Sequence, residues 1–180
     1  MRSRDNAATI ERDYSSGDTA IVLNRERGLI YWINVWFPVA VGIALVALES
    51  QEWFGSNYTS HPLRVLFEAI FGPLKPDTWE TIHHMIRKTG HVVGYGLLGL
   101  AWLRAWWMTL PHARLPTTAL RGLLGTAVVA SADEWHQAFL PNRTASAWDV
   151  LLDCCGAIGF YLIAYLFMRV YRPGKLTRPD

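Results

Sequence analysis

The chain has 180 residues, a length that fits one domain of ordinary size, and 51% of them are hydrophobic. Its 17 basic and 15 acidic side chains give a net charge of +2, and no basic stripe with interleaved aromatics argues for nucleic acid as a partner. The only cysteines, Cys154 and Cys155, are adjacent and point about 100° apart on a helix, which excludes a disulfide framework. The apolar residues gather in blocks, as is typical of a membrane protein.

The N-terminal segment, residues 1–28, is polar and charged, and no apolar run precedes Leu29. A cleavable signal peptide needs an apolar core near its start, so the pattern predicts none. We interpret this segment as a flexible cytoplasmic arm.

Four apolar segments of about 20 residues follow the arm. They cover residues 29–48, 88–108, 119–138 and 148–170, approximately. At 1.5 Å per residue, each is long enough to cross a hydrocarbon core of roughly 30 Å as a helix. We therefore predict an all-α membrane protein, a four-transmembrane-helix bundle over residues 29–172 with a short cytoplasmic tail at 173–180.

The long first loop contains an amphipathic stretch between Pro62 and Pro76. Its apolar residues recur at helical spacing: Leu63, Leu66, Phe67, Ile70, Phe71 and Leu74. Two interpretations remain open for this predicted helix. It lies in the membrane surface as an interfacial helix, or it packs on the bundle as an ordinary loop helix.

The basic residues predict the orientation of the bundle. The N-terminal arm, the second loop with its edges and the C-terminal tail together hold 12 of the 17 lysines and arginines. Because positive charge is enriched on the cytoplasmic side, both termini are expected to be cytoplasmic in a multi-pass protein of the inner (cytoplasmic) membrane.

With this orientation, the unusual polar residues all fall at the extracytoplasmic ends of the last three helices. Those residues are Lys88, His91 and Tyr95 on the second helix; Asp133, Glu134 and Gln137 on the third; Arg143 in the last loop; and Asp149 and Asp153 on the fourth. Within each helix they recur at spacings that share one face. We predict that they meet in one polar site.

The cost of ionisable groups in a membrane supports this prediction. Such a group at mid-bilayer costs roughly 2.5–3.5 kcal/mol on insertion scales, so the acids are expected to face Lys88 and Arg143 rather than lipid. In a second interpretation, these two cations are interfacial anchors that snorkel to the surface. Small residues on two helices predict close helix packing: Gly90 with Gly94, the added small positions Gly96 and Gly99, and Gly156 with Gly159 on the fourth helix.

Four of these residues, His91, Asp133, Asp149 and Asp153, are candidates for a metal site. These are suitable ligand types, but their spacing matches no known metal motif, so neither a metal nor a cofactor is predicted.

Two segments resemble the VanZ-like family of membrane proteins. Residues 88–99 (KTGHVVGYGLLG) are similar to the family's K-x-x-H-x-x-x-Y-x-x-L-G, and residues 133–153 (DEWHQAFLPNRTASAWDVLLD) to its D-E-x-x-Q-x-F-x-x-x-R-x-x-S-x-x-D-V-x-x-(D/N). Asn142 replaces a glycine that is common there, and asparagine tolerates the same left-handed backbone. The resemblance implies that the nine polar residues above are the family's characteristic positions. It also implies a link to low-level resistance to the glycopeptide teicoplanin, and it assigns no catalytic residue.

Three functions are compatible with these residues. The site binds an amphiphilic envelope component at the outer leaflet, such as a lipid-linked glycan or a lipoglycopeptide. Alternatively, the protein is a membrane enzyme acting on a lipid-linked or glycan substrate, with His91 or an aspartate as acid and base. In a third interpretation, the cluster is an ion-paired lock that stabilises the bundle without any ligand. The partners expected are the lipid bilayer and such a ligand.

Overall fold

The computed structural model describes residues 28–51, 56–140 and 145–171, and within these ranges it contains five α-helices and no strand. The all-α prediction is therefore confirmed for this part of the chain. Arg143, the tail at 173–180 and all but the last residue of the predicted arm at 1–28 lie outside the described residues. The chain divides into two compact units, residues 1–36 and residues 37–180.

The first unit contributes Gly28 and the beginning of helix α2 (Leu29–Glu49) to the described residues. The Gly28 carbonyl accepts hydrogen bonds from the backbone N–H groups of Tyr31 and Trp32, which closes the first turn of the helix. Pro38 lies inside α2, a position that membrane helices tolerate.

Two of the described helices are long and apolar enough to cross a membrane, judged by length and composition: α2 and α6 (Ala147–Tyr171). Only 11% of the most apolar window of α2 and 17% of that of α6 is buried. The core helix of a soluble protein would be mostly buried, and an apolar helix that is mostly exposed needs an apolar environment around it.

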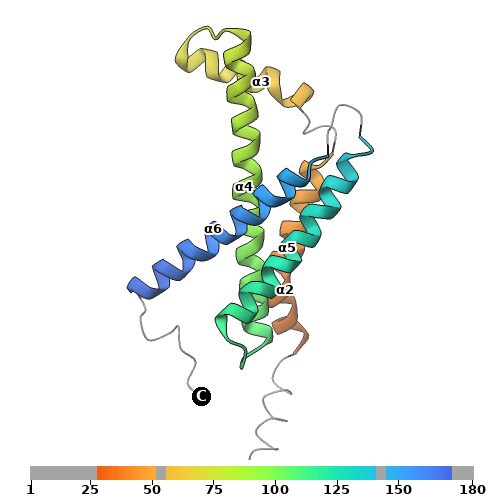
Figure 1. Ribbon diagram of the computed structural model, residues 1–180, viewed down its shortest axis with the longest axis vertical. Coiled ribbons are helices and arrows are strands. Elements are labelled where there is room, and N and C mark those ends of the chain that lie inside the picture. Colours follow the sequence, from red (N-terminus) through yellow and green to blue (C-terminus); the bar gives the residue numbers. More distant parts are fainter. Residues whose placement is uncertain (1–27, 52–55, 141–144, 172–180) are drawn as a thin grey trace, which may run out of the picture. The chain divides into compact units, whose positions relative to one another are not determined.

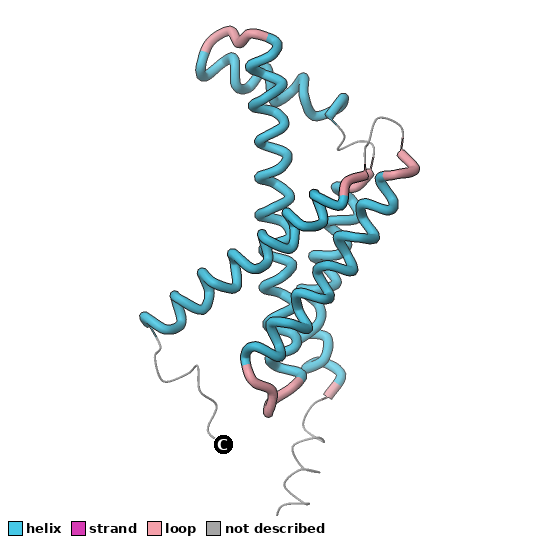
Figure 2. The backbone as a smooth tube through the Cα atoms, in the orientation of Figure 1, coloured by secondary structure: helices cyan, strands magenta, loops and turns pink. Residues whose placement is uncertain are grey.

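In the second unit, α4 (Pro76–Thr109), α5 (Leu115–Gln137) and α6 all pack on one another, as Figures 1 and 2 show. Helices α4 and α6 approach each other closely at Gly156, where an added Cβ would lie 2.6 Å from the backbone oxygen of Val92. A Cβ at Gly99 would likewise lie 2.8 Å from the Cβ of Ala157. Glycine is needed at both positions because backbone or a short side chain occupies the space.

The predicted close contact at Gly90 and Gly94 is not where the helices meet. An added Cβ at Gly90 would have no neighbour within 4 Å in the described structure, and one at Gly94 would lie 4.0 Å from Glu49. Of the other small positions predicted to allow close packing, Gly96, Gly99 and Gly156 do lie where α4 and α6 touch. An added Cβ at Gly159 has no neighbour within 4 Å in the described structure.

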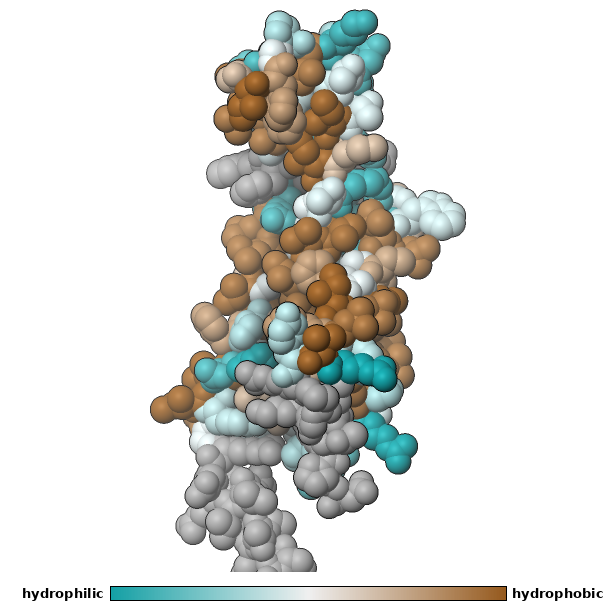
Figure 3. Space-filling model, turned by 90° about the vertical axis from the view of Figure 1, so that its left-hand side faces the viewer, coloured by the Kyte–Doolittle hydropathy of each residue, from teal (hydrophilic) through white to brown (hydrophobic). Residues whose placement is uncertain are grey.

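The second half of α2 joins the core of the second unit. Val46 clusters with Tyr95, Leu98 and Ala130, each less than a tenth exposed. Many large apolar side chains face outward instead, and hydrophobic atoms cover much of the face in Figure 3. On α4 and α5 they include Leu97, Leu124 and Val128, which are 56%, 57% and 69% exposed.

Helix α4 begins at Pro76, upstream of the predicted start of the second apolar segment at about residue 88. Proline in the first helical turn and Asp77 close behind it are ordinary signals of a helix start. The prediction followed only the apolar run, so it missed the polar first turns of the same helix.

The amphipathic stretch of the first loop forms α3 (Ser56–Phe71). The helix is followed by Gly72, which has a positive φ of 84°. This left-handed residue after a helix is a common stop signal. In the turn that follows, Glu68 accepts hydrogen bonds from the Arg64 side chain and from the backbone N–H of Leu74. Both contacts lower the pKa of Glu68, and the hydrogen bond from Arg64 has the larger effect.

One side of α3 packs on the first turns of α4. The indole N–H of Trp79 donates to the Ser60 hydroxyl at 2.7 Å, and the Thr59 hydroxyl lies 3.1 Å from Nε2 of His83. Burial, with a smaller effect of nearby Arg87, lowers the pKa of His83. The exposed side of the helix carries four large apolar residues, each more than half exposed: Val65, Leu66, Ile70 and Phe71.

Candidate functional site

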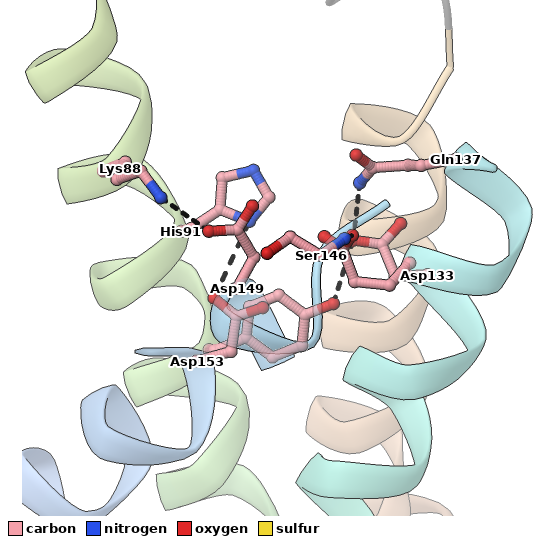
Figure 4. Close-up of polar contacts among 9 residues, drawn as sticks. Lys88, His91, Asp133, Gln137, Ser146, Asp149 and Asp153 are labelled. Atoms are coloured by element: carbon pink, nitrogen blue, oxygen red, sulfur yellow. Dashed lines mark hydrogen bonds and ion pairs between the residues drawn. The ribbon is translucent and has the colours of Figure 1, made fainter. Parts of the chain in front are cut away.

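The first contact of the candidate site joins α4 to α6. Nζ of Lys88 lies 2.5 Å from Oδ1 of Asp149, a hydrogen-bonded ion pair shown in Figure 4. The side chains are 44% and 31% exposed, so the pair lies at the edge of the packed helices. Asp149 occupies the first turn of α6, where the helix dipole favours a negative charge.

A second, deeper contact lies one turn further along both helices. Nδ1 of His91 is 3.7 Å from Oδ1 of Asp153, which is within ion-pair range but too long for a hydrogen bond. The His91 ring stacks on Tyr95, with centroids 6.2 Å apart. Asp153 is 1% exposed, and neither of its oxygens has a hydrogen-bond partner among the described residues.

Asp133 brings α5 into the same site. Its Oδ2 accepts hydrogen bonds from the Tyr95 hydroxyl and from the amide of Gln137, both at 3.1 Å. Its Oδ1 is buried and accepts no hydrogen bond within the described part of the chain. Figure 4 shows Asp133 and Gln137 on one helix facing the side chains from α4 and α6. The carboxylate is thus held by one oxygen and leaves the other available.

Glu134 lies beside Asp133 and makes a contact that the sequence analysis did not anticipate. Its Oε2 accepts a hydrogen bond of 2.7 Å from the backbone N–H of Ser146, just before α6. The Ser146 hydroxyl in turn accepts from the Trp148 N–H. The Ser-x-x-Asp spacing of Ser146 and Asp149 is a capping signature, which could have revealed this helix start.

A further pair was missed on the side of α5 that faces α2. The Ser50 hydroxyl lies 3.0 Å from Nδ1 of His136. His136 is not among the nine predicted site residues, and Ser50 carries no sequence signal beyond being a small polar residue after an apolar run.

Eight of the nine predicted site residues lie in the described structure. The contacts above link seven of them to one another across three helices, whereas Glu134 contacts the backbone of Ser146. The ninth, Arg143, is outside it. No group of three or more histidine, cysteine, aspartate or glutamate side chains within the described ranges has the geometry to hold a metal ion.

The described side chains of the site carry more acid than base. Asp133, Glu134, Asp149 and Asp153 face one lysine and one histidine. An ionised carboxylate can accept hydrogen bonds but cannot donate them. A buried acceptor that receives no hydrogen bond costs stability. The arrangement therefore suits a ligand group that brings hydrogen-bond donors, such as hydroxyl or ammonium.

Comparison with known proteins gives a family. Residues 30–168 match the family model described as VanZ/LLP1, which covers the first helix as well as all nine predicted site residues. The search of curated proteins and the search of solved structures each found no match. With its apolar helices α2 and α6, the chain belongs to the VanZ/LLP1 family of membrane proteins.

Proposed function

We propose that this protein binds an amphiphilic component of the bacterial envelope, or a lipoglycopeptide, through the polar site at the extracytoplasmic end of a four-helix bundle. The observation that carries the proposal is Asp153, a carboxylate that is 1% exposed and has no hydrogen-bond donor among the described residues. A buried acceptor of this kind costs stability unless a ligand supplies the missing donor.

The four-span arrangement is part of the proposal. Helices α4 and α5 pack against α6, the apolar helix that could itself cross a membrane. Outward-facing residues such as Leu97 and Leu124 would contact lipid if all these helices span together. The mean hydropathy of α4 and α5 falls short of that of α2 and α6, because polar residues gather at one end of each helix. Such polar ends are expected of membrane helices that carry a site.

The amphiphilic character of the ligand follows from this location. A site at the end of a membrane bundle receives the headgroup of a molecule whose chain stays in the bilayer. The donors that Asp133 and Asp153 lack match the hydroxyl groups of a glycan or the ammonium of an aminated headgroup. The half-exposed Lys88 would contact an anionic group such as phosphate. We propose on the same basis, and by family membership, that the protein affects sensitivity to teicoplanin.

A catalytic role is a second candidate, favoured by the contact of His91 with Asp153. An imidazole beside a buried carboxylate is a common general acid–base arrangement. In this case the ligand would be a lipid-linked or glycan substrate, and it would be converted rather than retained.

The test is to purify the wild-type protein in a mild detergent and to identify co-purifying lipids and glycolipids by mass spectrometry. Binding predicts an intact molecule close to equimolar with the protein, whereas catalysis predicts its conversion product. The His91→Ala variant is expected to lose most of this molecule, and His84→Ala, which removes an exposed histidine of the same helix, is expected to retain it. Wild-type protein that carries no amphiphile would contradict the proposal.

Reporter fusions test the proposed topology separately. Fusions after Thr78 and after Pro141 are both expected to report an extracytoplasmic location, because the flanking segments hold few of the basic residues. A cytoplasmic signal from either fusion would contradict the shared extracytoplasmic site.

A further inference from the structure

A pocket of about 300 Å³ lies between α2 and α5, beside the candidate site. This volume is at the lower end of the range for small-molecule pockets. Its inner part is lined by apolar side chains, including Ile43, Val46 and Val129. The pocket is therefore a place for hydrocarbon.

The opposite end of this pocket is polar. Ser50 and His136 line it and contact each other at 3.0 Å, and Asp133 lines it as well. From Ile43 to Ser50 the rise along α2 is about 10 Å at 1.5 Å per residue. Over that distance the lining changes from apolar to polar. In the proposed topology, the apolar end lies toward the interior of the bilayer and the polar end toward its outer surface.

Asp133 links the pocket to the candidate site. Its Oδ2 accepts hydrogen bonds from Tyr95 and Gln137, and its buried Oδ1 accepts none within the described residues. The same side chain contributes to the lining of the pocket. A molecule that donates to Asp133 therefore has an apolar pocket next to its headgroup.

The side of the pocket is accessible from the surroundings of the bundle. Ala47 and Ala132 line it from α2 and α5 and are both exposed, and Val128 beside them is 69% exposed. In a membrane these positions face lipid. A hydrocarbon chain could enter sideways without passing through the polar site, as suits a ligand that diffuses within the bilayer.

We propose that this pocket holds the part of the ligand's hydrocarbon chain nearest its headgroup, and that Asp133 marks the junction between the two. This inference rests on the proposed function, since it concerns the tail of the same amphiphile. It assigns the ligand to molecules with a flexible apolar chain attached directly to a donor-bearing headgroup. A water-soluble glycan or peptide would leave the pocket without an occupant.

The probe for this experiment is a phosphatidylglycerol with a photoactivatable diazirine on its acyl chain, in vesicles of phosphatidylethanolamine and phosphatidylglycerol that contain the protein. After illumination, labelled residues are identified by mass spectrometry. Labelling is expected to concentrate on Val128, Val129 and Ala132, above that of Leu124, which is lipid-exposed but does not line the pocket. Equal labelling of all these positions would overturn the inference.

The Ala47→Phe variant fills the pocket from its exposed wall, and Ala44→Phe is the matched control on an exposed position of the same helix outside the pocket lining. Labelling of the pocket residues in Ala47→Phe is expected to fall about fivefold or more, because the new ring occupies the space of the hydrocarbon chain. Ala44→Phe is expected to label like the wild type. Unchanged labelling in Ala47→Phe would overturn the inference.

The amount of co-purifying amphiphile, measured on the same preparations, separates this inference from the proposed function. If Ala47→Phe retains the wild-type amount of the amphiphile, the site binds its ligand without the pocket, so the inference fails and the function stands. If the wild type carries none, both fail.

Discussion

The ammonium group of Lys88 lies 2.5 Å from a carboxylate oxygen of Asp149, and both side chains of this pair are partly exposed. Partly exposed ion pairs contribute little to folding, typically 0.2–1 kcal/mol in measured cases, because water and salt screen them. The pair therefore orients two charges at the entrance of the site more than it holds the helices together.

For Lys88→Ala we therefore expect a loss of unfolding free energy no larger than about 1 kcal/mol, together with a clear loss of co-purifying amphiphile. Thermal unfolding in detergent and lipid mass spectrometry on the same sample measure the two effects. Lys75→Ala removes an exposed lysine just before α4 and serves as the control. A loss of about 3–5 kcal/mol in Lys88→Ala would instead indicate a structural lock.

The contact of α4 with α6 gives a prediction about packing. In Gly156→Ala the new Cβ would lie 2.6 Å from the carbonyl oxygen of Val92, so the helices must move apart, at a cost of roughly 1–3 kcal/mol. In Gly159→Ala the new Cβ has no neighbour within 4 Å in the described structure, and replacing glycine within a helix is expected to stabilise it by roughly 0.5–1 kcal/mol. Melting temperatures that change in the same direction in both variants would contradict this packing.

Much of the fold could be predicted from the sequence because apolar runs and helical periodicity are local signals. The apolar stripe through Leu66 and Ile70 predicted α3, and the run from Leu29 predicted α2. The start of α4 was missed since its first turns are polar. Which glycines touch a neighbouring helix depends on how far each helix is rotated about its axis, and sequence spacing alone does not determine that.

The contacts of Lys88 with Asp149 and of His91 with Asp153 could be expected for a related reason. Charged groups within apolar helices are expensive in a membrane, so their positions carry information even in a single sequence. The individual partners were harder to predict. Tyr95 and Gln137 both donate to Asp133, and the backbone N–H of Ser146 donates to Glu134. These partners depend on how far the three helices are shifted along their axes relative to one another. The pocket at Ser50 was missed since apolar side chains that line a pocket look like any other lipid-facing residues in the sequence.

The contact of α3 with α4 gives a prediction about pH. Burial and nearby Arg87 lower the pKa of His83 below the ordinary histidine value of about 6.5, so protonation is less favourable in the folded protein than in the unfolded chain. The stability that His83 contributes is therefore fully present at pH values above its ordinary pKa. It decreases as the pH falls below that value toward the lowered pKa of the folded protein. Protonation also disturbs the contact with Thr59 if Nε2 is the acceptor.

We expect amide hydrogen exchange in α3 to lose protection between pH 7 and pH 5, after correction for the intrinsic exchange rate. Amides of α5, far along the chain from this contact, serve as the internal reference. The His83→Gln variant keeps a polar side chain that does not titrate in this range, and its α3 protection is expected to be independent of pH. A wild-type α3 whose protection is the same at both pH values would contradict the assignment.

The most direct test of the binding site is the Asp153→Asn variant, because asparagine keeps the shape of the side chain and removes its buried charge. If Asp153 accepts a hydrogen bond from a ligand, the melting temperature in detergent is expected to stay the same or rise, since a buried charge without a donor costs stability. The co-purified amphiphile is expected to fall about tenfold, the equivalent of losing about 1.4 kcal/mol of binding. A stability loss of about 3–5 kcal/mol with the amphiphile fully retained would contradict the account and assign Asp153 to a structural lock with His91.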